Sequence, residues 1–328
     1  MHYYCETLDL TNPFPSMRDV TNCHTEFCWN EYLAEPFARV GLRAWCVVLL
    51  QGIALSRKYT HQFTPQPSSQ ELDEPSSATE RQNIQMHVCL ITRKSRINPG
   101  TRYTARGLNQ EGGPGNECEC EFIIWCQEQG NPHSPVEWTS YQWRRGTVPV
   151  WWQATLKSPV SEPGIQVRAE NPFEGSEKYY NRLLDRYGQI QITLVNMLRC
   201  DPNQKEVHLS EAFQESLKYV KGLVNIDLCL IKFDWHHILR QLGPEITAEG
   251  FWSTLRSVVK RTGLSSGTVS FEAVDENDPQ LPEWVGLQAF CPSGSLATHN
   301  IKQRQVGIAR FNCADSLDRT NIATFCKS

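Results

Sequence analysis

Residues 305–321 of the chain read QVGIARFNCADSLDRTN, and this stretch indicates the fold class. Its first part, Gln305–Phe311, is a short apolar run that predicts a buried strand. The polar segment 312–321 follows as a loop, and Ile322, Ala323 and Phe325 have the spacing of a helix start. The order strand, loop, helix places the loop at the carboxyl end of a strand, where α/β sheets bind ligands.

Upstream of this stretch, predicted helices alternate with apolar strands. Three helices are expected, with N-caps at Ser176, Ser210 and Thr247. The first of them ends at Gly188, and strands are expected at residues 190–198 and 226–235. Helices that separate nearly continuous apolar strands predict an α/β fold, with a mixed, largely parallel sheet flanked by helices.

The first half of the chain is richer in strand-like segments. Strands are expected at residues 45–54, 86–92, 118–125 and 140–153, the last one broken near Gly146 and Pro149. Residues 61–82 contain prolines, serines, glutamines and acidic residues with few apolar ones, which predicts a mobile surface loop. The run Gly112–Gly115 lacks the Lys-Ser/Thr ending of a nucleotide-binding loop, so a turn is expected there.

The loop carries a cysteine and an arginine separated by five residues, Cys313 and Arg319. A cysteine that faces a helix N-terminus and a guanidinium has a lowered pKa, as a thiolate nucleophile requires. A loop that curls into a helix aims successive backbone N–H groups at a phosphate, and the arginine fork binds two of its oxygens. The pattern therefore predicts a cysteine-dependent phosphatase with Cys313 and Arg319 as catalytic residues. The alternative is a buried structural cysteine before a helix whose first turn is acidic.

Two aspartates inside the loop, Asp315 and Asp318, are candidates for the proton donor to the leaving group. Either carboxylate could instead accept backbone N–H bonds of the loop, and the sequence does not choose between the two residues. Thr320, directly after the arginine, could hydrogen-bond the thiolate or remain a plain hydroxyl at a helix start.

Composition limits the other possibilities. The chain has 328 residues, of which 40% are hydrophobic and 21% charged, and its net charge of -4 does not indicate a nucleic-acid binder. The longest apolar run, Ala44–Leu55, is too short to span a bilayer, and the first residues do not resemble a signal peptide. The chain is expected to be cytoplasmic and to lack a transmembrane segment.

Thirteen cysteines are present without a CxxC pair. The one close pair, Cys118 and Cys120, has no second pair or nearby histidine that would complete a metal site. His236 and His237 are adjacent in sequence and make a poor metal pair. Reduced thiols, no metal and no cofactor are therefore expected.

The residues of the loop carry a resemblance to a known family. Residues 310–321, RFNCADSLDRTN, resemble the signature R-x-N-C-x-D-C-L-D-R-T-N of the Sac family of phosphoinositide phosphatases and depart from it only at Ser316. Four other stretches agree in order: YYCETLDLT (3–11), GTRYTARG (100–107), RGTVPVW (145–151) and FDWH (233–236). The chain is most similar to the long plant Sac proteins that also carry a WW-type module.

The resemblance implies hydrolysis of a phosphate monoester of an inositol lipid through a cysteinyl-phosphate. It also implies that residues 1–40 end an N-terminal Sac subdomain, that residues 41–328 belong to the catalytic domain, and that the chain is cut at both ends. Residues expected to contact the substrate are Asn312, Ala314, Ser316, Leu317, Thr320, Arg102, Arg106 and Arg145, with Arg144 in the same matching stretch.

Three readings follow from the sequence. The first is a phosphoinositide phosphatase, peripheral to membranes, whose substrate lies at a membrane surface. The second is a protein or dual-specificity phosphatase that uses the same loop. The third is a non-catalytic phosphoinositide-binding or scaffold fragment. The sequence does not indicate which ring phosphate is removed or the oligomeric state.

Overall fold

The computed structural model describes residues 1–4, 25–42, 46–63, 82–101, 104–128, 134–155, 164–200, 205–273, 295–315 and 319. The helices are α1 (Glu31–Arg39), α2 (Ser176–Tyr187), α3 (Glu206–Leu223) and α4 (Trp235–Thr262). The strands are β1 (His2–Tyr3), β2 (Leu50–Phe63), β3 (Gln82–Lys94), β4 (Cys118–Glu128), β5 (Val136–Thr147), β6 (Trp152–Thr155), β7 (Gly164–Val167), β8 (Gln191–Asn196), β9 (Asp227–Lys232), β10 (Ser265–Ala273), β11 (Ser295–Gln303) and β12 (Gly307–Cys313).

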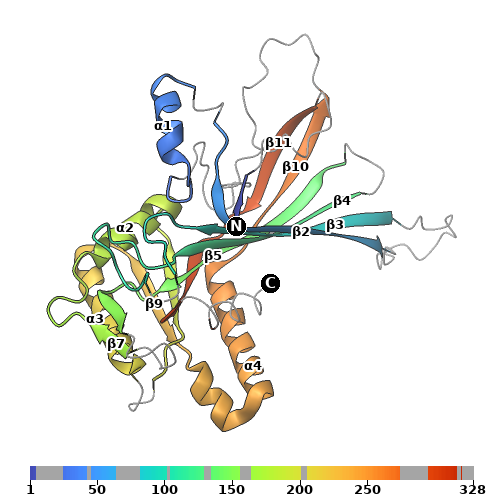
Figure 1. Cartoon of the computed structure of the whole chain (residues 1–328). Coiled ribbons are helices and arrows are strands. Elements are labelled where there is room, and N and C mark those ends of the chain that lie inside the picture. The colour runs from blue at the N-terminus through green and yellow to red at the C-terminus, as the bar shows by residue number, and fades with distance from the viewer. Residues whose placement is uncertain are drawn as a thin grey trace.

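One large mixed sheet organises these elements (Figure 1). Its strand order is β1-β2-β3-β4-β5-β12-β8-β9, and β10 pairs with both β5 and β11. The predicted α/β fold with a mixed sheet is confirmed. The parallel part is confined to β5, β12, β8 and β9, whereas β1 to β5 pair antiparallel. The antiparallel share is large because β3, β4 and β5 succeed one another as neighbours without crossover helices.

Helices cover the parallel part of the sheet on both faces. In Figure 1, α2 and α3 lie together at the left of the view, and α4 lies below the sheet. Ile308 of β12 packs in one buried cluster with side chains of α2 and α3. Phe311 and Cys313 pack in another with Phe251 and Leu255 of α4. Alternate residues of β12 therefore face opposite helical layers, which explains why the strand is buried along its whole length.

Several predicted strand limits shift. The first expected strand, 45–54, begins at Leu50 and runs on to Phe63. Both limits of the loop predicted at 61–82 are wrong, because residues 61–63 and residue 82 belong to the paired strands β2 and β3. Residues 64–81 of that loop lie outside the described residues. A turn at Gly112, with φ of 71°, fits the interpretation of the glycine run.

The three predicted helix caps are wrong. Ser176 is the first residue of α2, and its cap is Gly175 in the left-handed conformation. Ser210 lies inside α3, where its hydroxyl accepts a hydrogen bond from the amide of Asn196. Thr247 lies inside α4, beyond a kink at Gly243, and its hydroxyl donates to the carbonyl of Gly243. The hydroxyls of Ser210 and Thr247 therefore have partners other than the helix N–H groups that would make them caps. Within the described residues, the buried hydroxyl of Ser176 has no hydrogen-bond partner.

Polar residues of β4 extend under α2. The segment 117–121 reads ECECE, so its cysteines face α4 and its glutamates face α2, where they are buried. Buried arginines surround these glutamates. Arg93 binds Glu119 and Glu121, Arg186 binds Glu119, Arg144 binds Glu26, and Arg310 binds Glu117.

This buried ion network is closed by tyrosines. Tyr187 donates to Glu119, and Tyr179 donates to Glu117 at 2.6 Å. Burial alone would raise the pKa of the Glu119 carboxyl, but Arg186, Arg93 and Arg144 hold it well below its usual range. The network therefore remains charged and joins β3, β4, β5 and β12 to α2.

We expect Glu119→Gln to lower the free energy of unfolding by about 3–5 kcal/mol, because Arg93 and Arg186 would each lose a charged partner in the interior. Urea unfolding followed by circular dichroism measures the change. The matched control is Glu215→Gln in α3, whose pair with Lys218 is exposed and whose loss should cost less than about 1 kcal/mol. Equal effects of the two substitutions would contradict a structural role for the network.

Candidate active site

The predicted loop begins at the carboxyl end of the parallel strands. Cys313 is the last residue of β12 rather than a residue beyond it, and it lies opposite Thr147 of β5. Asn312 lies opposite Asn196, the last residue of β8. Because β5, β8 and β12 run parallel, their carboxyl ends meet here, as expected for the ligand-binding edge of such a sheet.

The thiol of Cys313 is fully buried and close to a carboxylate. Its Sγ donates a hydrogen bond to Oδ1 of Asp315, over 3.3 Å. Burial raises the pKa of the Cys313 thiol, Arg319 lowers it and Asp315 raises it, so that the net direction is upward. The loop pattern predicted a lowered pKa for the Cys313 thiol. That prediction is wrong, because burial and Asp315 raise this pKa more than the Arg319 guanidinium lowers it.

Arg319 is held at its outer end by a carboxylate that the sequence analysis missed. Its Nη1 and Nη2 donate to the two carboxylate oxygens of Glu206, both over 2.7 Å. Nη1 also donates to the backbone carbonyl of Met197, over 2.9 Å. The guanidinium lies near enough to Cys313 to lower the pKa of its thiol.

Glu206 is the first residue of α3 and is itself fixed by the backbone. Its Oε2 accepts a hydrogen bond from the backbone N–H of Arg199, over 2.8 Å. A carboxylate in the first turn of a helix is favoured by the helix dipole. That acidic start was the available sequence signal, but the expected cap at Ser210 placed the helix start five residues too late.

One of the predicted substrate-binding arginines, Arg106, contacts the loop. Arg106 donates from Nη1 to the backbone carbonyl of Ala314, and its guanidinium lies 5.7 Å from the ring centroid of Trp152. Arg144 does not reach the loop: it is 1% exposed and paired with Glu26 in the ion network, because its side chain faces α2. The suggestion that Arg144 meets the substrate is therefore wrong.

Arg145 faces the opposite side of β5, the side of Cys313. It lies opposite Phe311 of β12 and Cys118 of β4. Burial would lower the pKa of Arg145, but Cys118, Cys120 and, more weakly, Cys313 raise it. The same surroundings, led by a hydrogen bond with Cys120, lower the pKa of Cys118 to about 7.

The remaining predicted residues divide into two groups. Asn312 is buried on the face opposite Cys313, and among the described residues its side-chain amide has no hydrogen-bond partner. Five predicted residues lie outside the described residues: Arg102, Ser316, Leu317, Asp318 and Thr320. Within the described ranges, no group of three or more His, Cys, Asp or Glu side chains could hold a metal ion.

The residues that follow β9 place an imidazole, that of His236, near Arg319. Asp234 caps α4 by accepting from the backbone N–H of His237, and its other oxygen accepts from the N–H of Cys200. Burial lowers the pKa of His236, and Arg199 and Arg319 lower it further. His236 is therefore a neutral neighbour of the two arginines at neutral pH.

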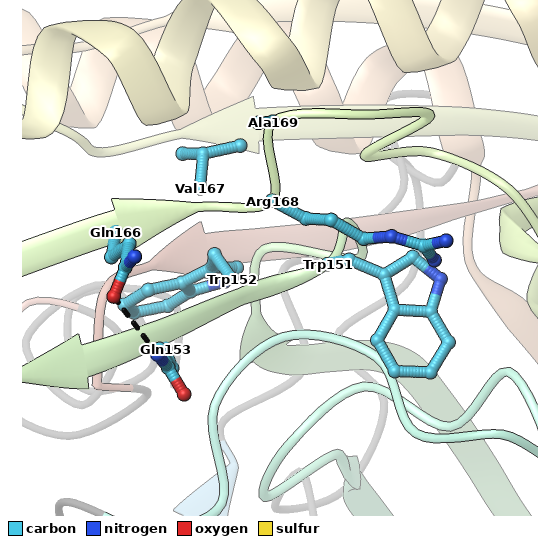
Figure 2. Close-up of a pocket in the computed structure, with 7 residues that line it drawn as sticks. All are labelled: Trp151, Trp152, Gln153, Gln166, Val167, Arg168 and Ala169. Carbon is cyan, nitrogen blue, oxygen red and sulfur yellow. Dashed lines mark hydrogen bonds between the residues drawn. The ribbon is translucent and has the colours of Figure 1, made fainter.

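A half-open cavity of about 440 Å³ lies at the β6–β7 hairpin (Figure 2). Figure 2 shows the side chains of Trp151 and Arg168 lying together, with Gln153 bonded to Gln166 at the far side. Trp152, which lines the cavity, lies beside Arg106, the arginine that donates to the carbonyl of Ala314.

Comparison with known proteins adds a family match. The family model described as the SacI homology domain matches residues 1–240 of the chain. The chain is 26% identical to the phosphoinositide phosphatase SAC2 of Arabidopsis thaliana, over 91% of the chain and 38% of that protein. It is 27% identical to SAC4 of the same plant, over 91% and 36%, respectively.

A yeast protein is similar at the same level. The phosphatidylinositol-3-phosphatase SAC1 of Saccharomyces cerevisiae is 26% identical over 98% of the chain and 44% of that protein. The chain therefore spans less than half the length of each of these relatives. Among the residues the structure describes, we find no helix with the length and apolar character needed to cross a membrane.

We expect Asp315→Asn to speed alkylation of Cys313 by iodoacetamide at pH 7 by roughly three- to tenfold, because removal of the neighbouring negative charge lowers the thiol pKa. Mass spectrometry of the tryptic peptide 311–319, which contains no other cysteine, measures the rate. The control is Asp227→Asn, at the amino end of β9, which should leave the rate unchanged. A slower rate in Asp315→Asn would contradict the described contact.

Proposed function

The chain belongs to the SacI homology domain family, and from this premise we propose that it is a phosphoinositide phosphatase that removes a phosphate monoester from an inositol lipid. The observation that supports this proposal most is the meeting of Cys313 and Arg319 at the carboxyl end of the parallel strands. The relatives' printed names, which include phosphoinositide and phosphatidylinositol-3-phosphatases, agree with this substrate class.

In the proposed reaction Cys313 is the nucleophile and Arg319 binds the phosphate. The thiolate attacks phosphorus, the bond from phosphorus to the inositol oxygen breaks, and a cysteinyl-phosphate forms. Arg319 donates hydrogen bonds to two equatorial oxygens and offsets the charge that they carry in the transition state. Water then attacks the cysteinyl-phosphate and releases inorganic phosphate and the thiol.

The proposed proton path runs through Asp315. Because the thiol donates to the Asp315 carboxylate, the proton can move from Cys313 to Asp315 as the nucleophile forms. The resulting carboxylic acid then protonates the leaving inositol oxygen, and the proton count balances without another donor. This contact favours Asp315 over Asp318 as the acid.

Further contacts with the substrate are proposed for residues beside the loop. Arg106 holds the backbone at Ala314, and Arg145 adds positive charge on the Cys313 side of the sheet. We propose that Asn312 also contacts the substrate, as do Arg102, Ser316, Leu317 and Thr320 of the matching motifs. We also propose that residues 1–40 end an N-terminal subdomain and that residues 41–328 form the catalytic domain. The proposed location is cytoplasmic and peripheral to membranes, where the lipid substrate lies.

The test is phosphate release from each phosphoinositide, presented in phosphatidylcholine vesicles, by the full 328-residue chain. We expect release by the wild type that falls below about one thousandth in Cys313→Ser, whose hydroxyl is a far weaker nucleophile. Cys46→Ser, remote in sequence from the loop, is the matched control and should retain activity.

Other outcomes distinguish the alternatives. Preference for a phosphotyrosine peptide over every lipid would indicate a protein phosphatase. Binding of inositol lipids without turnover, unchanged in Cys313→Ser, would indicate a scaffold fragment. Either result would overturn the proposed function.

A second test addresses the acid. Asp315→Asn should lower kcat for phosphoinositides by roughly 100-fold or more, because the inositol oxygen leaves poorly without a proton. The loss should be much smaller for p-nitrophenyl phosphate, whose leaving group needs no proton. The same comparison with Asp318→Asn is the control, and a leaving-group-dependent loss in that variant alone would assign the acid to Asp318.

A further inference from the structure

The contact between Arg319 and Glu206 is the best-defined interaction around the loop that the proposed function does not use. An arginine side chain has five N–H donors in a fixed plane. Within the described part of the chain, Arg319 donates three bonds: two from Nη1, to Met197 and Glu206, and one from Nη2, to Glu206. These bonds occupy the end of the guanidinium.

The remaining two N–H groups lie on one edge of the guanidinium. They are the Nε–H and the second N–H of Nη2, which are parallel and match two oxygens of a tetrahedral anion. Glu206 therefore leaves the binding edge of Arg319 available, although it pairs with the guanidinium. A carboxylate on that edge would instead have competed with the phosphate.

Glu206 is well placed to fix the direction of that edge. Its own carboxylate is held by the backbone N–H of Arg199 over 2.8 Å and by its place in the first turn of α3. The side chains of Arg319 and Glu206 are only 12% and 14% exposed, so solvent weakens their interaction little. The bidentate geometry fixes the guanidinium plane as well as its position.

We propose that Glu206 is a positioning residue that orients Arg319 so that its Nε–Nη2 edge faces the oxyanion of the substrate phosphate. This inference rests on the proposed function for its substrate but predicts anion binding that needs no lipid. It assigns Glu206 no contact with the substrate. Its effect is transmitted through Arg319 alone.

The first experiment measures the affinity of the full chain for tungstate, a tetrahedral oxyanion, by isothermal titration calorimetry. We expect Glu206→Gln to weaken binding roughly tenfold or more, since the amide cannot accept both guanidinium bonds. Glu211→Gln, on the exposed side of the same helix, is the matched control and should bind as the wild type does. Absence of tungstate binding by the wild type, or equal affinities of wild type and Glu206→Gln, would overturn the proposal.

A double-mutant comparison tests whether the effect passes through Arg319. In an Arg319→Ala background, Glu206→Gln should cause no further loss of tungstate affinity. Additive losses would mean that Glu206 acts by itself, which would overturn the positioning role. Circular dichroism of each variant separates these results from unfolding, and Glu206→Asp, which keeps the charge, should recover part of the affinity.

Alkylation of Cys313 separates positioning from simple charge. If Arg319 stayed in place, removal of the Glu206 charge would speed alkylation, because the thiol pKa would fall. If Glu206 holds Arg319, its removal lets the guanidinium move away, and alkylation of peptide 311–319 should slow. A faster rate in Glu206→Gln would overturn the proposal. Loss of tungstate affinity in Glu206→Gln without any lipid turnover by the wild type would instead count against the proposed function only.

Discussion

The buried pairing of glutamates in β4 and directly before it with arginines from four other elements is the interaction on which the rest of the structure depends. Glu117 and Glu119 are almost fully buried and bind arginines of β3, α2 and β12. Removing charges from water is costly, and only complete pairing offsets that cost. Each strand must therefore keep its register, because a shift by one residue would turn a charged side chain into the apolar layer on the other face.

The same constraint positions the nucleophile. Arg310 is bound to Glu117 on the α2 face, so residue 313, an odd number of positions further along β12, must face α4. Gly146 belongs to this arrangement, since a Cβ there would lie 2.0 Å from Glu117 Oε2 and 2.6 Å from Arg310 Nη2. Two of the motif stretches thus serve the ion network, and through it they fix where the loop begins.

The sequence predicted the elements better than their partners. Apolar runs identified β8 and β12 because both faces of those strands are buried. The run of β9 was also identified, although most of its residues are only partly buried. Arg144 could not be separated from Arg145 by sequence, since adjacent residues differ only in the face they meet, and the ECECE pattern gives no sign that its charged face is covered. Glu206 was missed because its partner lies 113 residues away, a separation for which local patterns carry no information.

The two kinds of arginine pair in this molecule differ in what they leave available. Arg310 is fully buried, and Glu117, Tyr179 and the carbonyl of Thr147 surround it, so it serves to hold the strand in place. Arg319 lies at the carboxyl end of the parallel strands. Glu206 holds the Nη1–Nη2 end of its guanidinium and leaves the Nε–Nη2 edge for an anion. A guanidinium that is held by protein at one end loses little further freedom when an anion binds the other edge. The partial pairing of Arg319 is therefore better suited to recognition of a phosphate than either a free arginine or a fully paired one.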